Sequence, residues 1–213
     1  MRTHPLKIGL DFDNTIVCYD EAIAELAEKK LRLPTDLPRT KLDLRDYLLA
    51  AGREQEWTAF QGELYGPGMA NARPFEGAIE TMQALVEAGH QLTIVSHRSR
   101  RPYAGTPHDL HESAREWVSQ RLQTAGLFLG EGETTEDNSS VSFLETREAK
   151  VARIAELGLH LFVDDLPEVL GAPNFPRVTV GVLFVPNSDI ICEQKEYIIS
   201  AWKELPQIID RLQ

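Results

Sequence analysis

The sequence predicts an α/β protein with a mostly parallel sheet covered by helices on both faces and a small helical lobe inserted into it. Short apolar runs alternate with amphipathic segments over most of the 213 residues. One stretch is longer than the connection between two neighbouring strands requires, and its sequence pattern is helical. A chain of this length suits one globular domain with an insertion and buries roughly 70% of its unfolded surface. With 42% hydrophobic and 26% charged residues, the composition is that of an ordinary globular protein.

Net charge and cysteine content narrow the class of protein. A formal charge of −11 argues against nucleic acid as a partner, because phosphate contacts need clustered Lys and Arg. No apolar run approaches 18 residues, so we expect no membrane partner and no membrane span. The start MRTHPLKIGLDFD reaches two carboxylates before any signal-like stretch, which predicts no secretory signal. Two cysteines, Cys18 and Cys192, are too few for a disulfide framework or a four-cysteine zinc site, so we expect a cytoplasmic protein.

The predicted strands are short apolar runs rich in β-branched residues. They cover 6–10, 91–95, 141–144, 159–163 and 178–185. Because these runs are nearly continuously apolar, the pattern favours strands buried on both faces of a parallel sheet.

Amphipathic segments between and after these strands predict helices over 77–88, 109–124, 147–157 and 194–212. In the first of them, the apolar residues Ile79, Met82, Leu85 and Val86 follow steps of three, three and one, which places them on one helical face. Gly89 then marks the end of that helix.

The surplus stretch lies between the first and second strands. One helix is enough for that crossover, and 77–88 provides it, so about fifty residues remain unexplained. They read as helices over 21–31, 41–51 and 53–64, separated by Pro34, Pro38 and Gly52. We therefore predict an α/β core of residues 1–19 and 73–213 and an inserted helical lobe of residues 20–72. A second irregular stretch, 130–140, is acidic and rich in Gly and Ser, and we expect a mobile surface loop there.

Polar residues follow three of the predicted strands where each apolar run ends. The first strand ends in Asp11 and Asp13, the second in Ser96, and the fourth in Asp164 and Asp165. In open parallel sheets, ligands bind at this edge, near the switch in strand order. Taken singly, these residues have ordinary structural explanations, such as turn formation, helix capping by Ser96, or a capping box from Asp165 to Glu168.

Together, the four carboxylates point to a cation. If the strands are neighbours, two like charges about 4 Å apart repel by about 4 kcal/mol at an effective dielectric constant near 20. Such a cluster needs a compensating positive charge. Carboxylate oxygens without histidine or thiolate favour Mg²⁺, which keeps several waters and shares a phosphate oxygen.

Four segments in order, LDFDNTIV, TIVSHRS, a lysine and FVDDLPEVL, resemble the four motifs of the haloacid dehalogenase (HAD) superfamily. The resemblance runs from Lys7 to Val185, with the inserted lobe where a helical cap is found in that family. It implies a HAD-like, Rossmann-like core and a Mg²⁺-dependent phosphatase that forms a phospho-aspartate intermediate. A cap beside the site would favour a small phosphorylated metabolite as substrate over a folded protein or duplex nucleic acid.

The resemblance also implies roles for single residues. Asp11 would be the nucleophile, and Asp13 the acid and base that serves the leaving oxygen and then the attacking water. Phosphate binding would fall to Ser96, Lys150, Thr15 and Asn14, with Thr15 fixing the loop and Lys150 neutralising charge.

The metal ligands implied are Asp11, Asp13 through its carbonyl, and Asp165, with Asp164 in an outer-shell or water-mediated role. Glu168 could hold a metal-bound water or simply cap a helix.

The choice of Lys150 has support from the local sequence. It lies near the amino end of a predicted helix, where the macrodipole disfavours a cation, and beside the apolar row Val151, Ile154 and Leu157. Lys195 and Lys203 fit the description of solvated surface lysines better.

Several alternatives stay open. Asp13 and the acidic pair argue against a dehalogenase, and no lysine of the lobe has a context that suggests a phosphonatase. A phosphomutase, a phosphorylatable regulatory domain of the receiver type and an inactive HAD-like binding protein remain alternatives to a phosphatase.

The segment after Ser96 carries possible substrate contacts. His97 and Arg98 are possible substrate contacts. Arg98, Arg100 and Arg101 could bind a second anionic group, or form a solvated basic loop that pairs with surface acids. His108 and His111 share a helical face, but no cysteine or further histidine is near them. Thr106 fits the pattern of a helix N-cap. We expect structural roles for both histidines. Trp57, Phe60 and Tyr65 are expected to form the small core of the lobe.

Overall fold

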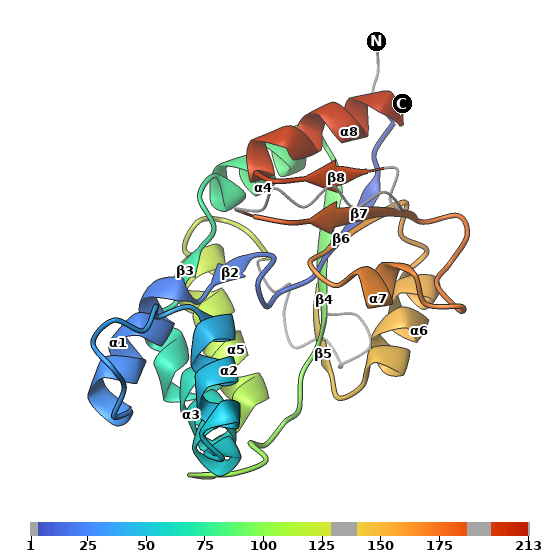
Figure 1. The fold of residues 1–213 in the computed structure, drawn as a ribbon. Coiled ribbons are helices and arrows are strands. Elements are labelled where there is room, and N and C mark those ends of the chain that lie inside the picture. The colour runs from blue at the N-terminus through green and yellow to red at the C-terminus, as the bar shows by residue number, and fades with distance from the viewer. Residues whose placement is uncertain (1–3, 129–139, 187–196, 213) are drawn as a thin grey trace. The chain divides into compact units, whose positions relative to one another are not determined.

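The chain forms a six-stranded sheet in which every neighbouring pair of strands is parallel. This computed structural model describes residues 4–128, 140–186 and 197–212 (Figure 1). The strands are β1 (Lys7–Leu10), β4 (Gln91–His97), β5 (Val141–Leu144), β6 (Leu161–Asp164), β7 (Val180–Phe184) and β8 (Ile198–Ile199). The α/β class with a parallel sheet is therefore confirmed.

The strand order β5-β4-β1-β6-β7-β8 places β1 in the middle of the sheet. The chain first moves outward from β1 through β4 to β5, and then returns to the other side of β1 for β6, β7 and β8. Leu10 of β1 is level with Ile94 of β4 and with Val163 of β6. The switch in strand order thus lies at the carboxyl end of β1, the position at which such sheets bind ligands.

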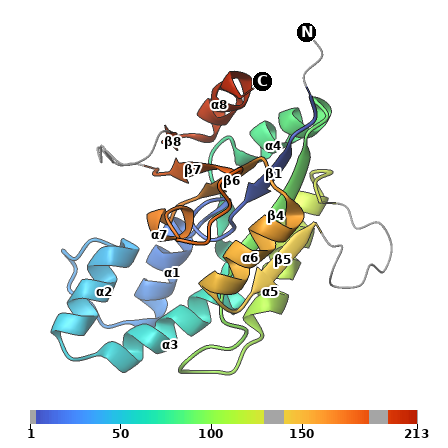
Figure 2. The same ribbon diagram turned by 90° about the vertical axis from the view of Figure 1, so that its right-hand side faces the viewer.

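Helices cover both faces of this sheet. On one side lie α6 (Arg147–Leu157) and α7 (Pro167–Leu170), and on the other α4 (Ala78–Glu87) and α8 (Leu205–Arg211) (Figures 1 and 2). The α6 face holds a buried apolar cluster of Val95, Val151, Ile154, Leu159, Phe162, Val169, Leu170 and Leu183. Because strand side chains alternate between faces, these residues identify the sheet positions that face α6.

Local signals define α6 well. The Thr146 side chain accepts a hydrogen bond from the Ala149 N–H and caps the amino end of the helix. Gly158 ends the helix in the left-handed conformation, with φ of 59°. The helix covers 147–157, as predicted, and the β5 strand covers 141–144, as predicted.

The predicted helix over 194–212 is wrong. Its described part contains β8, a 3-10 turn (Trp202–Glu204) and the short helix α8. Ile198 and Ile199 are β-branched and pair with β7, where the Leu183 N–H donates to the Tyr197 carbonyl over 3.0 Å. Pro206 in the first turn of α8 fits a helix start, because proline lacks an N–H to donate. Pairing with the sheet thus outweighed the helical periodicity.

The contacts divide the chain into two compact units, which we describe separately. Unit 1 comprises Met1–Val17, Pro74–His97 and Leu122–Gln213, and unit 2 comprises Cys18–Arg73 and Arg98–Arg121. The chain passes between the units four times, within β2 (Val17–Cys18), within β3 (Arg73–Pro74), after His97 and after Arg121. β2 and β3 form a separate two-stranded sheet.

Unit 2 is helical. It contains α1 (Asp20–Lys30), α2 (Lys41–Ala50), α3 (Glu54–Tyr65), a 3-10 turn (Pro67–Asn71) and α5 (Leu110–Val118). A π-helical turn (Ser119–Gln123) follows α5 and crosses the limit between the units at Arg121. The first three helices match those expected in the lobe. The sequence assigned 98–121 to the core, whereas the contacts group this stretch with the inserted helices. The domain limits of 20–72 remain a prediction.

Trp57 and Phe60 are buried in the core of unit 2, as expected, whereas Tyr65 is half-buried. The rings of Trp57 and Phe60 stack with centroids 5.8 Å apart, and Tyr19 packs edge-on against Tyr65 at 5.2 Å. The indole N–H of Trp117 donates to the Ala72 carbonyl over 2.9 Å.

Three expectations concern residues that the structure does not describe. The expected surface loop 130–140 falls outside the described residues except for Ser140, and Cys192 and Lys195 also fall outside them. Within the described ranges, every helix is too short or too polar to cross a membrane.

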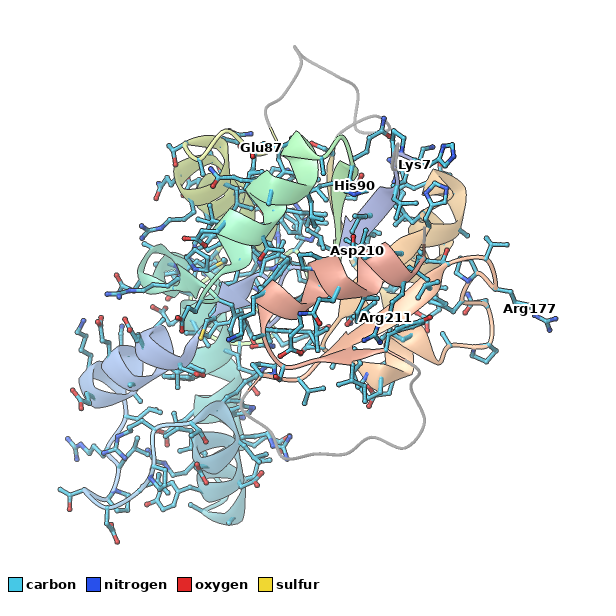
Figure 3. All side chains as sticks on the ribbon, turned by 90° about the horizontal axis from the view of Figure 1, so that it is seen from above. Lys7, Glu87, His90, Arg177, Asp210 and Arg211 are labelled. Atoms are coloured by element: carbon cyan, nitrogen blue, oxygen red, sulfur yellow. The ribbon has the colours of Figure 1, made fainter. Side chains whose placement is uncertain are left out.

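Two histidines hold the amino end of β1. The Nδ1 atom of His90 accepts a hydrogen bond from the Leu6 N–H over 3.1 Å, and Nδ1 of His160 accepts one from the Lys7 N–H over 2.8 Å. His90 is buried, and burial lowers its pKa even though the charge of Asp210 acts in the opposite direction (Figure 3). His90 is therefore held in the neutral form that can accept this bond.

We expect the stability of the fold to decrease as the pH falls below about 6.5, in part because of His90. Below that pH the unfolded chain binds a proton at this imidazole while the folded chain does not, so the proton favours unfolding. His90→Asn keeps an acceptor for Leu6 and does not titrate. The urea midpoint of this variant should change less between pH 7.5 and pH 5.5 than that of the unmodified protein. An equal change in both proteins would contradict this role of His90.

Candidate active site

The carboxyl ends of the three central strands bring the predicted polar residues together. Asp11 follows β1, Asp164 is the last residue of β6, and Ser96 and His97 are the last two residues of β4. All four belong to unit 1. The site can therefore be described within one compact unit.

At the centre of the site, Lys150 lies between two carboxylates. Its Nζ atom is 2.6 Å from Oδ1 of Asp11 and 2.7 Å from Oδ2 of Asp164. The side chains of Lys150 and Asp164 are fully buried, and that of Asp11 is only 4% exposed. Lys150 is thus not a solvated surface residue, and the order of the sequence motifs selected the buried lysine.

The register of the sheet explains this grouping. The Asp11 N–H donates to the Val163 carbonyl over 2.8 Å, so the ladder between β1 and β6 continues one residue beyond β1. Asp11 and Asp164 therefore lie side by side and face the same side of the sheet. That side is covered by α6, from which Lys150 reaches the two carboxylates.

Burial and charge act on these groups in opposite directions. Burial by itself lowers the pKa of Lys150, but the charges of Asp11 and Asp164 outweigh it and hold the pKa above its usual value. Burial, together with the charge of Asp11, raises the pKa of Asp164 to about 7. One ammonium between two carboxylates leaves the buried group with an excess of negative charge whenever Asp164 is ionised.

A third carboxylate completes a possible cation site. Asp11, Asp164 and Asp165 each offer an oxygen, and these oxygens all lie within 4.8 Å of one another. Hard oxygen ligands and excess negative charge are the features that suit Mg²⁺. The residues present therefore fit a divalent cation of this kind.

Asp164 and Asp165 both belong to the carboxylate group at the end of β6, and Asp164 also contacts Lys150. The direct metal contact of Asp165, which lies one residue beyond the strand, and the outer-shell role of Asp164 remain predictions. Asp11 follows Leu10 and Asp164 follows Val163, the last apolar residues of neighbouring parallel strands, so equal offsets place the two carboxylates level with each other.

Hydrogen bonds within its own backbone stabilise the loop after β1. The amides of Ile16 and Val17 both donate to the Phe12 carbonyl, over 3.0 and 2.9 Å. Asn14 has φ of 58°, a left-handed conformation that asparagine tolerates better than most residues. Asp13 is half-buried in this loop and forms an isolated β-bridge with Val17. The backbone geometry therefore places Asp11, Asp13 and Asn14 in one tight turn.

Thr15 connects this loop to Asp11. Its hydroxyl is fully buried and donates to Oδ2 of Asp11 over 3.3 Å. Its carbonyl accepts a hydrogen bond from the indole of Trp202 over 3.1 Å. The two oxygens of Asp11 thus have different neighbours, the Lys150 ammonium on one and the Thr15 hydroxyl on the other.

Two polar atoms at the end of β4 lack partners among the described residues. They are Oγ of Ser96, a residue that is 1% exposed, and Nδ1 of His97. Burial, followed by the positive charge of Lys150, lowers the pKa of His97 and favours its neutral form. Leaving a buried polar atom without a hydrogen bond costs about 1–3 kcal/mol, and such exceptions concentrate where a ligand supplies the missing partner.

Arg98 lies in unit 2, where it is buried. Its guanidinium donates to the Tyr65 carbonyl over 3.2 Å and lies 5.6 Å from the centroid of the Tyr65 ring. Its carbonyl lies 2.9 Å from Nε2 of His111, in keeping with the structural role expected for that histidine. These contacts, which the sequence did not reveal, hold Arg98 to the helices of unit 2.

The start of α5 differs from expectation in its cap. Asp109, rather than Thr106, is the N-cap, and its Oδ1 accepts hydrogen bonds from the amides of His111 and Glu112, both over 3.0 Å. A carboxylate directly before the helix is the better acceptor for these amides. Its Oδ2 also forms an ion pair with Arg100 at 2.9 Å.

Comparison with solved structures identifies the fold as that of the haloacid dehalogenase superfamily. A "predicted phosphatase" from Clostridium acetobutylicum matches with a TM-score of 0.59 and 11% identity, covering 98% of this chain and 100% of that chain. A HAD family hydrolase from Deinococcus radiodurans, with bound phosphate and sodium, has a TM-score of 0.57 and 15% identity, with coverage of 98% and 96%. A HAD-hydrolase from Bacillus subtilis, bound to magnesium, has a TM-score of 0.57 and 12% identity, with coverage of 97% and 100%.

Among proteins compared by sequence, a "Putative nucleotidase" from Bacillus cereus is 23% identical over 174 residues, which span 78% of this chain and 79% of that protein. No protein-family model matches the chain. The likeness thus extends over nearly the whole fold at low sequence identity.

Removing the positive charge of Lys150 should destabilise the fold strongly. We expect Lys150→Met to lower the free energy of unfolding by about 3–5 kcal/mol, because it leaves buried carboxylates without their counter-charge. Urea denaturation at pH 7.5 without divalent cations measures this. Lys203→Met, at an exposed lysine, is the matched control and should stay within about 0.5 kcal/mol.

The double variant Lys150→Met/Asp164→Asn tests the cause of the loss. Removing one of the two carboxylate charges should recover part of the stability lost in Lys150→Met. If the second substitution adds a further loss of the ordinary size, lost packing rather than uncompensated charge would explain the effect.

Proposed function

We propose that this protein is a Mg²⁺-dependent phosphatase that hydrolyses a small phosphorylated metabolite through a phospho-aspartate intermediate. The observation that carries the proposal is the buried group of Asp11, Lys150 and Asp164 at the switch point of the sheet. Asp165 beside it, and the buried hydroxyl of Ser96, which has no hydrogen-bond partner among the described residues, support the same interpretation.

The metal would be held by Asp11, Asp164 and Asp165, with the carbonyl of Asp13 as a further ligand. When bound, it supplies positive charge that offsets the repulsion between a carboxylate nucleophile and an anionic phosphoryl group. The magnesium and the phosphate with sodium in the two structural neighbours are consistent with such a site.

Asp11 is the nucleophile in this mechanism. Its carboxylate oxygen forms a bond to phosphorus while the bond from phosphorus to the leaving oxygen breaks, which gives an aspartyl phosphate. Lys150 and Thr15 fix the orientation of this carboxylate, and Lys150 also neutralises negative charge that develops on the phosphoryl oxygens. The hydroxyl of Ser96 donates to one of these oxygens and thereby gains the hydrogen-bond partner that the described residues do not supply.

Asp13 carries the proton. It first donates a proton to the leaving oxygen, and then accepts a proton from the water that attacks the aspartyl phosphate. The second step releases inorganic phosphate and restores both carboxylates. A general acid at this position favours hydrolysis of esters over dehalogenation.

The class of substrate follows from charge and from the relatives. The net charge of −11 disfavours nucleic acid and anionic membrane surfaces, so a small phosphorylated metabolite is the proposed partner. The name of the Bacillus cereus relative adds nucleotides to the substrates to be tested.

We place the protein in the cytoplasm, because two cysteines give no disulfide framework.

We expect Asp11→Asn to lower the rate of phosphate release by at least about 10³-fold while leaving the thermal midpoint within a few degrees. EDTA should have a comparable effect on the unmodified enzyme, and Mg²⁺ should reverse it. The assay measures inorganic phosphate from a panel of phosphorylated sugars, nucleotides and hydroxy acids. Activity that survives both EDTA and Asp11→Asn would refute the mechanism, whereas stable labelling by acetyl phosphate without turnover would favour a regulatory domain.

We expect Asp13→Asn to lower kcat by about 10²–10⁴-fold for an alkyl phosphate, because the leaving alkoxide then departs without a proton. The loss should be smaller for p-nitrophenyl phosphate, whose leaving group needs no protonation. Single-turnover measurements of the two substrates give the comparison. Equal losses for both would show that Asp13 does not act as the acid.

A further inference from the structure

His97 lies on the same side of the sheet as the proposed nucleophile. It is the last residue of β4, and alternation along the strand places its side chain on the same face as Val95. Val95 packs with Val151 and Ile154 of α6 in one buried cluster. His97 therefore faces the first turns of α6, from which Lys150 also projects.

The proposed phosphatase mechanism assigns no role to His97. Its Nδ1 atom is buried and makes no hydrogen bond to any residue in the ranges described. The mechanism uses the hydroxyl of Ser96 and the ammonium of Lys150 for phosphoryl oxygens, and neither contacts this nitrogen. A buried nitrogen kept without a partner costs stability, which indicates a missing ligand atom.

Arg147 is a second cation whose charge acts on His97 at this edge of the sheet. His97 is level with Leu144 at the end of β5, and Arg147 follows Leu144 by three residues. On α6, Arg147 and Lys150 are three residues apart and so lie on neighbouring positions of one helical face. Arg147 is exposed, and it has no ion pair within residues 4–128, 140–186 and 197–212.

The position of Arg147 does not stabilise the helix that carries it. It occupies the first residue of α6, where the helix dipole disfavours a positive charge. The charges of Lys150 and Arg147 both act on His97 and lower its pKa, after the larger effect of burial. Arg98 and Arg100 are less suitable for this role, since both are engaged within unit 2.

We propose that His97 and Arg147 bind a second anionic group of the substrate beside the reacting phosphoryl group, so that the enzyme prefers phosphorylated acids and bisphosphates to simple phosphate monoesters. The inference rests on the proposed function for the position of the phosphoryl group. A guanidinium matches a carboxylate or phosphate with two parallel N–H donors, and a neutral imidazole protonated at Nδ1 donates one more. Positive charge at this point would also attract a dianionic ligand to an acidic protein.

Binding can be measured without turnover in the full-length Asp11→Asn protein with Mg²⁺, by isothermal titration calorimetry. The probes are 3-phosphoglycerate, which carries a carboxylate, fructose 1,6-bisphosphate, which carries a second phosphate, and glycerol 3-phosphate, which carries neither. We expect one or both of the first two to bind at least about tenfold more tightly than glycerol 3-phosphate, the factor that one charge-assisted hydrogen bond provides. The preferred probe identifies the second anionic group.

Variants in the same background assign the preference to residues. Arg147→Gln and His97→Ala should each reduce the preference about tenfold, and His97→Asn, whose amide N–H can replace Nδ1–H, should retain part of it. Arg177→Gln is the matched control, because Arg177 is an exposed arginine of the same unit that projects into solvent in Figure 3.

The outcomes separate this inference from the proposed function. No preference in the parent protein, no binding of any probe, or an equal loss for all three probes in Arg147→Gln would overturn the inference. Turnover of monoesters by the unmodified enzyme in that case would leave the proposed function intact. A preference that Arg147→Gln abolishes, in a protein that hydrolyses nothing, would support the binding site and reject the phosphatase.

Discussion

The fully buried ammonium of Lys150, held between Asp11 and Asp164, is the contact on which the rest of the site depends. A charge removed from water is tolerated only when it is paired, and here each partner comes from a different strand while the lysine comes from the helix that covers them. The β1–β6 register and the start of α6 must therefore be correct together. An error in either one would leave a charge buried alone.

The same region has two buried polar atoms, Oγ of Ser96 and Nδ1 of His97, that make no hydrogen bond to any described residue. Asp165 adds a third carboxylate beside an already negative pair. Neither feature increases the stability of the fold by itself. Such conflicts between local stability and local chemistry are typical of functional sites, where a ligand supplies the missing hydrogen bonds and charge.

The sequence predicted much of this arrangement because its signals are local. Apolar runs ending in carboxylates located the strand ends, and the poor fit of Lys150 at the amino end of a helix distinguished it from surface lysines. These local signals failed where contacts with distant parts of the chain determine the structure. Ile198 and Ile199 pair with β7, which their helical periodicity did not reveal, and Arg98 is held by Tyr65 of unit 2.

From the sequence alone, the α/β class, the inserted helices and the set of polar residues at the strand ends could be determined, because periodicity, caps and motif order are properties of short segments. Tertiary structure alone decided which carboxylate lies level with Asp11, which side of the sheet carries Lys150, and that His97 and Arg147 share this edge. These facts depend on strand register and helix placement. Both are set by the packing of segments that lie more than a hundred residues apart in the chain, as the contact between Asp11 and Lys150 (139 residues apart) illustrates.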